Sequence, residues 1–194
     1  MSKKLSANQA RTVTEFLGSA HVFVSALMDV MEQKVIEQVS GGKLTFEQLK
    51  VLQLVAKADR HNVSDVSAFM QVSNAAASKM VDKLVRKKFL RRGEGAADRR
   101  HTHLFLTNAG ARLLTVYEAR RLEATVKLLE SMPLREIRNL SGTLDKLSAR
   151  IVNHAIGADD VCLQCGIRFR ERCVLGDDSG DTCTYMRRRR RRTE

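Results

Sequence analysis

The stretch from Asn62 to Gly110 constrains the fold of this chain more than any other. It predicts a short helix from about Ser64 to Phe69, with Ser64 as the N-cap, and a turn at Gln71 and Val72. Ser73 then caps a second helix, because a serine side chain can accept a hydrogen bond from an amide of the first helical turn. Two helices joined by so tight a turn must pack against each other at a steep angle.

The second of these helices has two distinct faces. Its apolar residues recur at helical spacing and should form one buried stripe; they are Ala77, Met80, Val81, Leu84 and Val85. The opposite face is polar and mostly basic, with Asn74, Ser78, Lys79, Asp82, Lys83 and Arg86. A capped second helix with small polar and basic side chains is typical of the recognition helix of a helix-turn-helix.

A basic hairpin is predicted directly after the helix-turn-helix. Residues 89–92 form a short strand, the glycine-containing run 93–98 forms a turn, and residues 102–106 form the returning strand. Thr107 then offers an N-cap for a long helix. A hairpin in this place, with arginines on it, is a wing.

The wing carries a family resemblance. The signature consists of Asp98, Arg99 and Arg100, then five residues, then Leu106, Thr107 and finally Gly110. This pattern resembles the wing signature of the MarR family of winged-helix regulators, and the order of elements fits over roughly residues 5–154. The resemblance implies a dimeric DNA-binding regulator in which Asp98 orients Arg100, the arginine inserted into DNA.

One position departs from the family pattern. Members of the family usually have glycine just after the recognition helix, whereas this chain has Lys88. We therefore expect Lys88 to adopt the left-handed backbone conformation that glycine adopts at low cost.

Long amphipathic helices flank the winged helix. Residues 7–39, 108–131 and 134–154 carry apolar side chains at helical spacing. The N-terminal pattern is too long and too apolar for one domain face, so a second subunit should cover it. In the resembling family the first and last helices interleave to build the dimer. The predicted fold class is mainly α: a winged helix-turn-helix with long N- and C-terminal dimerisation helices and a small β-hairpin wing.

The charge balance indicates a polyanionic partner. The chain has 34 basic and 22 acidic residues, a net charge of +12, and Arg187–Arg192 form an unbroken run. Double-stranded DNA is the expected partner, and a homodimer would read a pseudo-palindromic operator. The N-terminus shows no secretory signal and no apolar run approaches about 18 residues, so we expect a cytoplasmic protein without a membrane partner.

Candidate DNA contacts lie on the recognition helix and the wing. Asn74 can bond adenine at two points, alanine methyls can touch thymine methyls, and Lys79 can reach phosphate or guanine. The alternative is a polar face that is merely solvated. The full candidate set is Ser73, Asn74, Ala75, Ala76, Ser78, Lys79, Lys83, Arg91, Arg92, Asp98, Arg99 and Arg100.

A second constellation follows the last helix. All four cysteines of the chain, Cys162, Cys165, Cys173 and Cys183, fall within residues 162–183. Four thiolates in a short segment suit a tetrahedral sulfur site. Their uneven spacing favours a [4Fe–4S] cluster, while Cys-x-x-Cys-Gly also resembles one zinc knuckle, so zinc remains the alternative. Free thiols on an unstructured tail are the third interpretation.

These patterns predict three regions and one function. Residues 1–156 form the winged-helix and dimerisation domain, residues 157–186 the metal or cluster segment, and residues 187–194 a basic disordered tail. We expect a transcription regulator that senses redox state, iron or a diatomic gas, with cluster occupancy acting on the last helix and hence on the dimer. The alternatives are a purely structural Zn(Cys)4 site and an iron–sulfur electron carrier or enzyme component. No paired carboxylates, nucleophile motif or phosphate loop indicates an enzyme.

Overall fold

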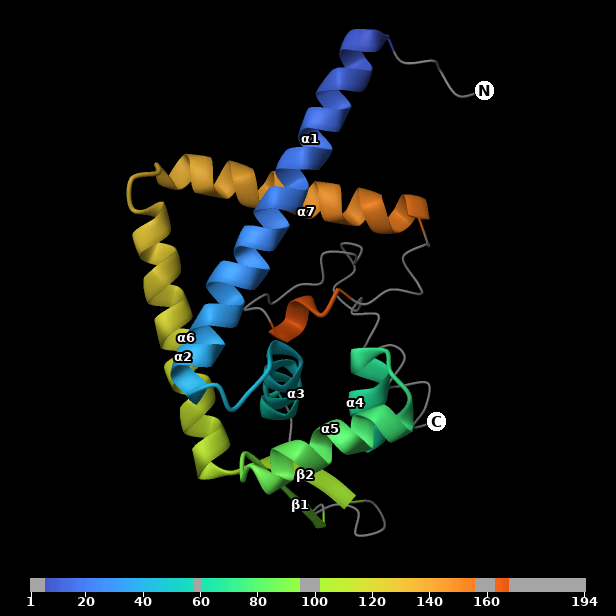
Figure 1. The fold of residues 1–194 in the computed structure, drawn as a ribbon, viewed down its shortest axis with the longest axis vertical. Coiled ribbons are helices and arrows are strands. Elements are labelled where there is room, and N and C mark those ends of the chain that lie inside the picture. The colour runs from blue at the N-terminus through green and yellow to red at the C-terminus, as the bar shows by residue number, and fades with distance from the viewer. Residues whose placement is uncertain (1–5, 58–60, 95–101, 156–162, 168–194) are drawn as a thin grey trace.

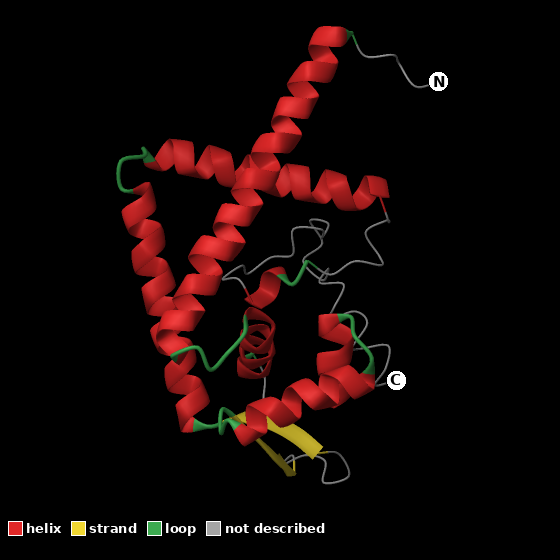
Figure 2. Ribbon diagram, in the orientation of Figure 1, coloured by secondary structure: helices red, strands yellow, loops and turns green. Residues whose placement is uncertain are grey.

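The computed structural model describes residues 6–57, 61–94, 102–155 and 163–167, which are mainly helical and carry one two-stranded antiparallel sheet (Figures 1 and 2). The predicted fold class is confirmed in these residues. The elements in chain order are α1 (Ala7–Ser25), η1 (Ala26–Glu32), α2 (Gln33–Ser40), α3 (Phe46–Ala56), α4 (Val63–Met70), α5 (Asn74–Arg86), β1 (Leu90–Glu94), β2 (Thr102–Leu106), α6 (Asn108–Leu129), α7 (Leu134–Ala155) and η2 (Cys165–Ile167).

The first three elements form one continuous helical arm. Ser6 and Gln9 make a capping box at its start, and Gly41, with φ of 58°, ends it. The sequence predicts this arm but not its middle part, η1, which is a π-helix. A π-turn adds a residue to the helical turn and thereby re-aims the side chains that follow it.

A buried polar cluster holds the arm against α6. Glu32, the last residue of η1, is 1% exposed. Its carboxylate accepts a hydrogen bond from the Tyr117 hydroxyl and pairs with Arg121 Nε at 2.9 Å. A buried carboxylate needs such partners, because losing water without replacement is costly. The cluster therefore fixes where the arm leaves the winged helix.

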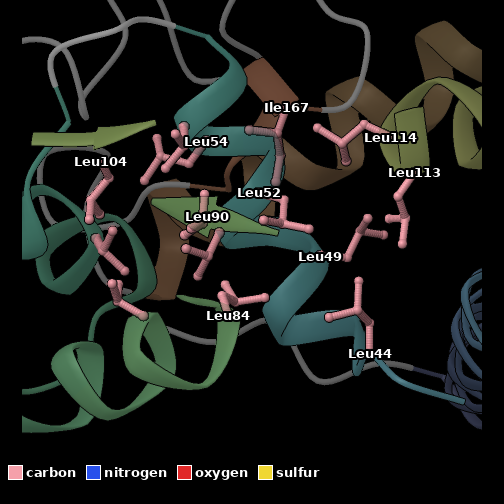
Figure 3. Packing of buried hydrophobic residues seen from close by; sticks show 14 of the residues in the cluster. Leu44, Leu49, Leu52, Leu54, Leu84, Leu90, Leu104, Leu113, Leu114 and Ile167 are labelled. Atoms are coloured by element: carbon pink, nitrogen blue, oxygen red, sulfur yellow. The ribbon is translucent and has the colours of Figure 1, made fainter. Parts of the chain in front are cut away.

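The core lies around α3. Thr45 and Gln48 form the predicted capping box, and the residues of α3 buried in the core include Leu49, Val51, Leu52, Leu54 and Val55. Helices α4, α5 and α6 and both strands contribute to the same cluster (Figure 3). Because α3 is buried along most of its length, it is the scaffold on which the recognition helix and wing are mounted.

The cap of α4 corrects one expectation. Ser64 was the predicted N-cap, but Asn62 occupies that position. The Asn62 side chain accepts from the Asp65 amide and the Asp65 carboxylate accepts from the Asn62 amide, each at 2.9 Å. This reciprocal pair satisfies two helix-end donors, whereas a cap at Ser64 would start the helix two residues later.

The wing hairpin pairs Leu90 with Leu106 and Glu94 with Thr102. Strand β1 therefore runs two residues beyond the predicted end at Arg92. His61 also joins the sheet, because its carbonyl accepts from the Leu104 amide at 2.7 Å. This bridge connects β2 of the wing to His61, which lies just before the helix-turn-helix. The sequence does not indicate this link.

Wide apolar faces remain exposed on the long helices of the single chain. Val22 on α1 is 70% exposed, and Leu122 on α6 and Ile151 on α7 are each 65% exposed. In Figure 1, α1 extends away from the winged helix and α7 runs crosswise to it. The sequence led us to expect no apolar run long enough to cross a membrane, but by length and composition the arm from Ala7 to Ser40 is long and apolar enough. Helices of soluble proteins pass the same test.

Candidate nucleic-acid interface

The N-terminal half of α5 presents its polar face to solvent. Ser73 caps the helix by accepting from the Ala76 amide at 3.2 Å, as predicted. The predicted contact residues that are exposed here are Ser73, Asn74, Ala75, Ala76, Lys79 and Lys83, and Ser78 is half-buried. On the other face Ala77, Val81 and Leu84 are fully buried. The helix is thus anchored on one side and open on the side that the sequence assigns to DNA.

The turn before α5 is tightly fixed. Gln71 adopts a left-handed conformation with φ of 56°, and its amide bonds Ser67. The Val72 amide also donates to the Ser67 carbonyl at 3.1 Å, while the Ser67 hydroxyl donates to the Val72 carbonyl at 2.6 Å. These bonds fix the angle between α4 and α5, which determines how α5 can enter a groove.

The C-terminal end of α5 is held by two lysines. Lys88 has φ of 61°, which confirms the expected left-handed conformation. The Thr107 hydroxyl donates to the Lys88 carbonyl at 2.6 Å, so the start of α6 holds this strained position. Lys87 Nζ donates to Gln48 Oε1 at 3.0 Å and to the Lys43 carbonyl, which connects α5 to the start of α3.

The wing is connected to the recognition helix by charge. Arg92 pairs with Asp82 of α5 at 2.8 Å, and both side chains are nearly half exposed. Arg91 stacks its guanidinium over the Phe105 ring, 4.4 Å from the centroid. Asp82 also lines a shallow hollow with Lys79 and Lys83. Arg92 thus lies on a surface that is continuous with the basic face of α5, whereas Arg91 lies on the other face of the hairpin with Phe105.

The remaining predicted wing residues, Asp98, Arg99 and Arg100, lie outside the described residues. Their assigned roles stay predictions. The Asp82–Arg92 pair and the Lys87–Gln48 contact were missed by sequence reasoning. The ten-residue separation of Asp82 and Arg92 gives no local signal, because the pairing depends on how the hairpin folds back beside α5.

Only one of the four cysteines falls in the part of the chain that the structure describes. Cys165 begins η2 and is 8% exposed. Cys162, Cys173 and Cys183 lie outside it. Among the described residues no group of three or more His, Cys, Asp or Glu side chains could hold a metal ion. The predicted cluster or zinc site is therefore untested.

Comparison with known families gives one match, which lies on the winged helix. Residues 44–102, from the start of α3 to the returning strand of the wing, match the MarR family. The matched segment contains the helix-turn-helix and wing described above, and this family comprises transcription regulators rather than enzymes.

Individual proteins show the same similarity. The chain is 26% identical over 100 residues to the HTH-type transcriptional repressor MdtR of Bacillus subtilis (strain 168), a match that spans 52% of this chain and 64% of the relative. Among solved structures, YusO of Bacillus subtilis is 23% identical with a TM-score of 0.59, covering 74% of this chain and 98% of YusO. FabT of Streptococcus pneumoniae, solved in complex with DNA, is 22% identical with a TM-score of 0.60, covering 74% and 98%.

Proposed function

We propose that this protein is a homodimeric, sequence-specific DNA-binding regulator of transcription. The observation that carries the proposal is the exposed polar face of α5, held by its buried stripe and continuous with the basic wing. In a major groove, Asn74 would bond an adenine edge while Lys79 and Lys83 would contact phosphate or guanine. Arg99 and Arg100 would enter the adjacent minor groove, where negative potential favours arginine.

The exposed apolar faces support a homodimer. A second copy of the chain would cover α1, α6 and α7, whose apolar side chains include Val22, Leu122 and Ile151. The same cover would account for the apolar arm without a membrane, and we infer a cytoplasmic protein. A two-fold symmetric pair presents one α5 to each half-site of a pseudo-palindromic operator, with half-site centres about one helical turn apart. FabT, whose structure was solved with DNA, has a similar fold.

Positive charge would supply most of the non-specific attraction. Phosphate contacts release condensed counterions, so the affinity of a basic chain of net charge +12 should fall steeply with salt. The run Arg187–Arg192 would add contacts that do not depend on sequence. Specificity would then rest on α5 and the wing rather than on the tail.

The experiment is a selection of randomised duplexes by the full chain, followed by fluorescence anisotropy with the selected duplex and a scrambled one. Specific binders typically prefer their own site by a factor of at least about 1,000. Equal affinity for the two duplexes at about 150 mM salt would contradict sequence-specific binding, even if both bind well.

We further propose that Cys162, Cys165, Cys173 and Cys183 bind a [4Fe–4S] cluster that makes DNA affinity responsive to redox state, iron or a diatomic gas. The clustering of all four cysteines after α7 supports this. A structural zinc site is the alternative, and an electron carrier is a second. Anaerobic purification with iron, sulfide and zinc analysis separates them. A colourless protein with one zinc per chain, or equal metal in Cys173→Ser, would contradict the cluster.

A further inference from the structure

A short segment after α7 returns to the winged helix and packs into its core. Ile167, the last residue of η2, is 4% exposed and belongs to the same apolar cluster as the α3 leucines. Figure 3 shows Ile167 close to Leu54 and Leu114, and Figure 1 shows η2 beside α3. The segment therefore buries an isoleucine among side chains that support the recognition helix.

A hydrogen bond adds a second anchor. Gln164 Nε2 donates to the Phe69 carbonyl at 2.8 Å. Phe69 lies in the last turn of α4. The Gln164 side chain provides a donor at this helix end. The backbone of Gln164 has φ of 56°, a left-handed conformation that residues other than glycine rarely adopt.

The position of this anchor matters for DNA binding. Phe69 is separated by Met70 alone from the turn of Gln71 and Val72, and Ser73 then caps α5. A contact on the Phe69 carbonyl therefore acts on the backbone that sets the angle between α4 and the recognition helix. Ile167 acts on the same unit through α3, against which η2 packs.

We propose that Gln164–Ile167 form an intramolecular clip that holds the helix-turn-helix in its DNA-binding arrangement. The C-terminal segment thereby controls DNA affinity through the core of the winged helix. This route differs from the one expected from the sequence, which ran through α7 and the dimer. The inference rests on the proposed DNA-binding function, and it does not require the cysteines to bind a metal.

The test compares two substitutions of Gln164 in the full chain. Gln164→Glu keeps the side-chain length and removes the donor. Gln164→Gly removes the donor and also relieves the left-handed backbone. If backbone strain were the important quantity, Gln164→Gly would tighten the clip and Gln164→Glu would leave it unchanged. If the hydrogen bond is important, both loosen the clip. Leu163→Ala, at a side chain that is 39% exposed, is the control.

Two measurements are made on each variant. The first is hydrogen exchange at the Val72 and Ala76 amides, which bond Ser67 and Ser73. The second is affinity for the duplex selected by the unaltered chain. Both Gln164 variants should exchange about 2- to 10-fold faster at these amides and bind about 2- to 10-fold more weakly, the range expected for one hydrogen bond. Leu163→Ala should match the unaltered chain.

A substitution of Ile167 tests the apolar anchor. Ile167→Val removes one methyl group and should give the same pattern with a stable fold. Unchanged exchange and affinity in all three variants would overturn the clip. Failure of the unaltered chain to select any duplex would instead overturn the proposed function, while exchange would still test whether the clip holds the turn.

Discussion

Lys88 is the residue at which backbone geometry and side-chain type conflict most clearly. Its φ of 61° joins α5 to β1, and Phe89 then donates its amide back to Leu84 at 3.0 Å. A left-handed conformation costs a non-glycine residue about 1–2 kcal/mol. The Thr107 hydroxyl on the Lys88 carbonyl helps to hold it. Strain at this joint is tolerated because it sets the direction of the wing.

The first prediction concerns this strain. Lys88→Gly and Lys88→Ala both remove the charge, but only glycine relieves the backbone. We expect the glycine variant to exceed the alanine variant by about 1 kcal/mol in free energy of unfolding. Urea denaturation of both at equal concentration measures the difference. An alanine variant that is as stable as the glycine variant would contradict the assigned strain.

The second prediction concerns Gly110 in the first turn of α6. A Cβ at this position would overlap the Phe89 carbonyl oxygen, which is backbone and cannot rotate away. Gly110→Ala should therefore lower the free energy of unfolding by about 1–3 kcal/mol, although alanine favours helices. The neighbouring exposed Ala111→Gly gives the reference, a loss of about 1 kcal/mol from helix propensity. If Gly110→Ala is neutral or stabilising in thermal denaturation, the close approach is absent.

Residue features were predictable where their causes are local. Ser73 and the Thr45–Gln48 box follow from neighbours within a few residues, whereas the conformation of Lys88 was predicted from the family pattern, which has glycine there. The prediction of Ser64 as the N-cap of α4 was wrong. Asn62, two residues earlier, can also start the helix, and its reciprocal bonds with Asp65 decide between the two starts. The Gln164 contact joins residues far apart in sequence, so no spacing could indicate it.

At the scale of elements, α5 and the wing form one basic surface. The Asp82–Arg92 pair lies between them, but it is exposed and contributes little to folding energy. Its effect is geometric, because it holds an arginine of β1 beside the lysines of α5. The sequence predicted both elements, yet it could not predict the bridge from His61 to β2 or the π-turn of the arm, since both depend on distant packing.

The third prediction tests the lysines on this surface. Lys79→Ala and Lys83→Ala should each weaken binding to all duplexes and reduce the slope of log affinity against log salt by about 1, as phosphate contacts do. Lys127→Ala, an exposed lysine toward the α7 end of α6, should leave the slope unchanged. Salt titrations followed by fluorescence anisotropy give these slopes. A slope unaffected by both α5 substitutions would place the phosphate contacts elsewhere.

At the scale of the whole molecule, the exposed faces of α1, α6 and α7 are the surfaces that the proposed dimer would cover. Among the described residues, nearly all of the exposed large apolar side chains lie on these helices or on η1, and the arm that bears Val22 is fixed to α6 by the Glu32 cluster. An arm fixed in this way would transmit the geometry of the proposed dimer to its two recognition helices. The amphipathic patterns made the helices predictable, but not the angles at which they leave the winged helix.

The fourth prediction places a charge on these faces. Val22→Asp and Ile151→Asp should shift the protein from dimer to monomer in light scattering, because an aspartate is costly to bury in an apolar interface. Affinity for the selected duplex should fall, while weak binding to random DNA should persist. Asn139→Asp adds the same charge to α7 at an exposed polar position and should stay dimeric. Dimers in all three variants would contradict this interface.

The most direct test of the account is to repeat the duplex selection with Asn74→Ala beside the unaltered chain. The unaltered chain should enrich a two-fold symmetric motif whose half-site centres lie about one helical turn apart. Asn74→Ala should lose preference at one base pair in each half-site, at a cost of about 1–3 kcal/mol, with the rest of the motif retained. An identical motif from both proteins, or no enriched motif from either, would contradict the claim that α5 reads DNA sequence.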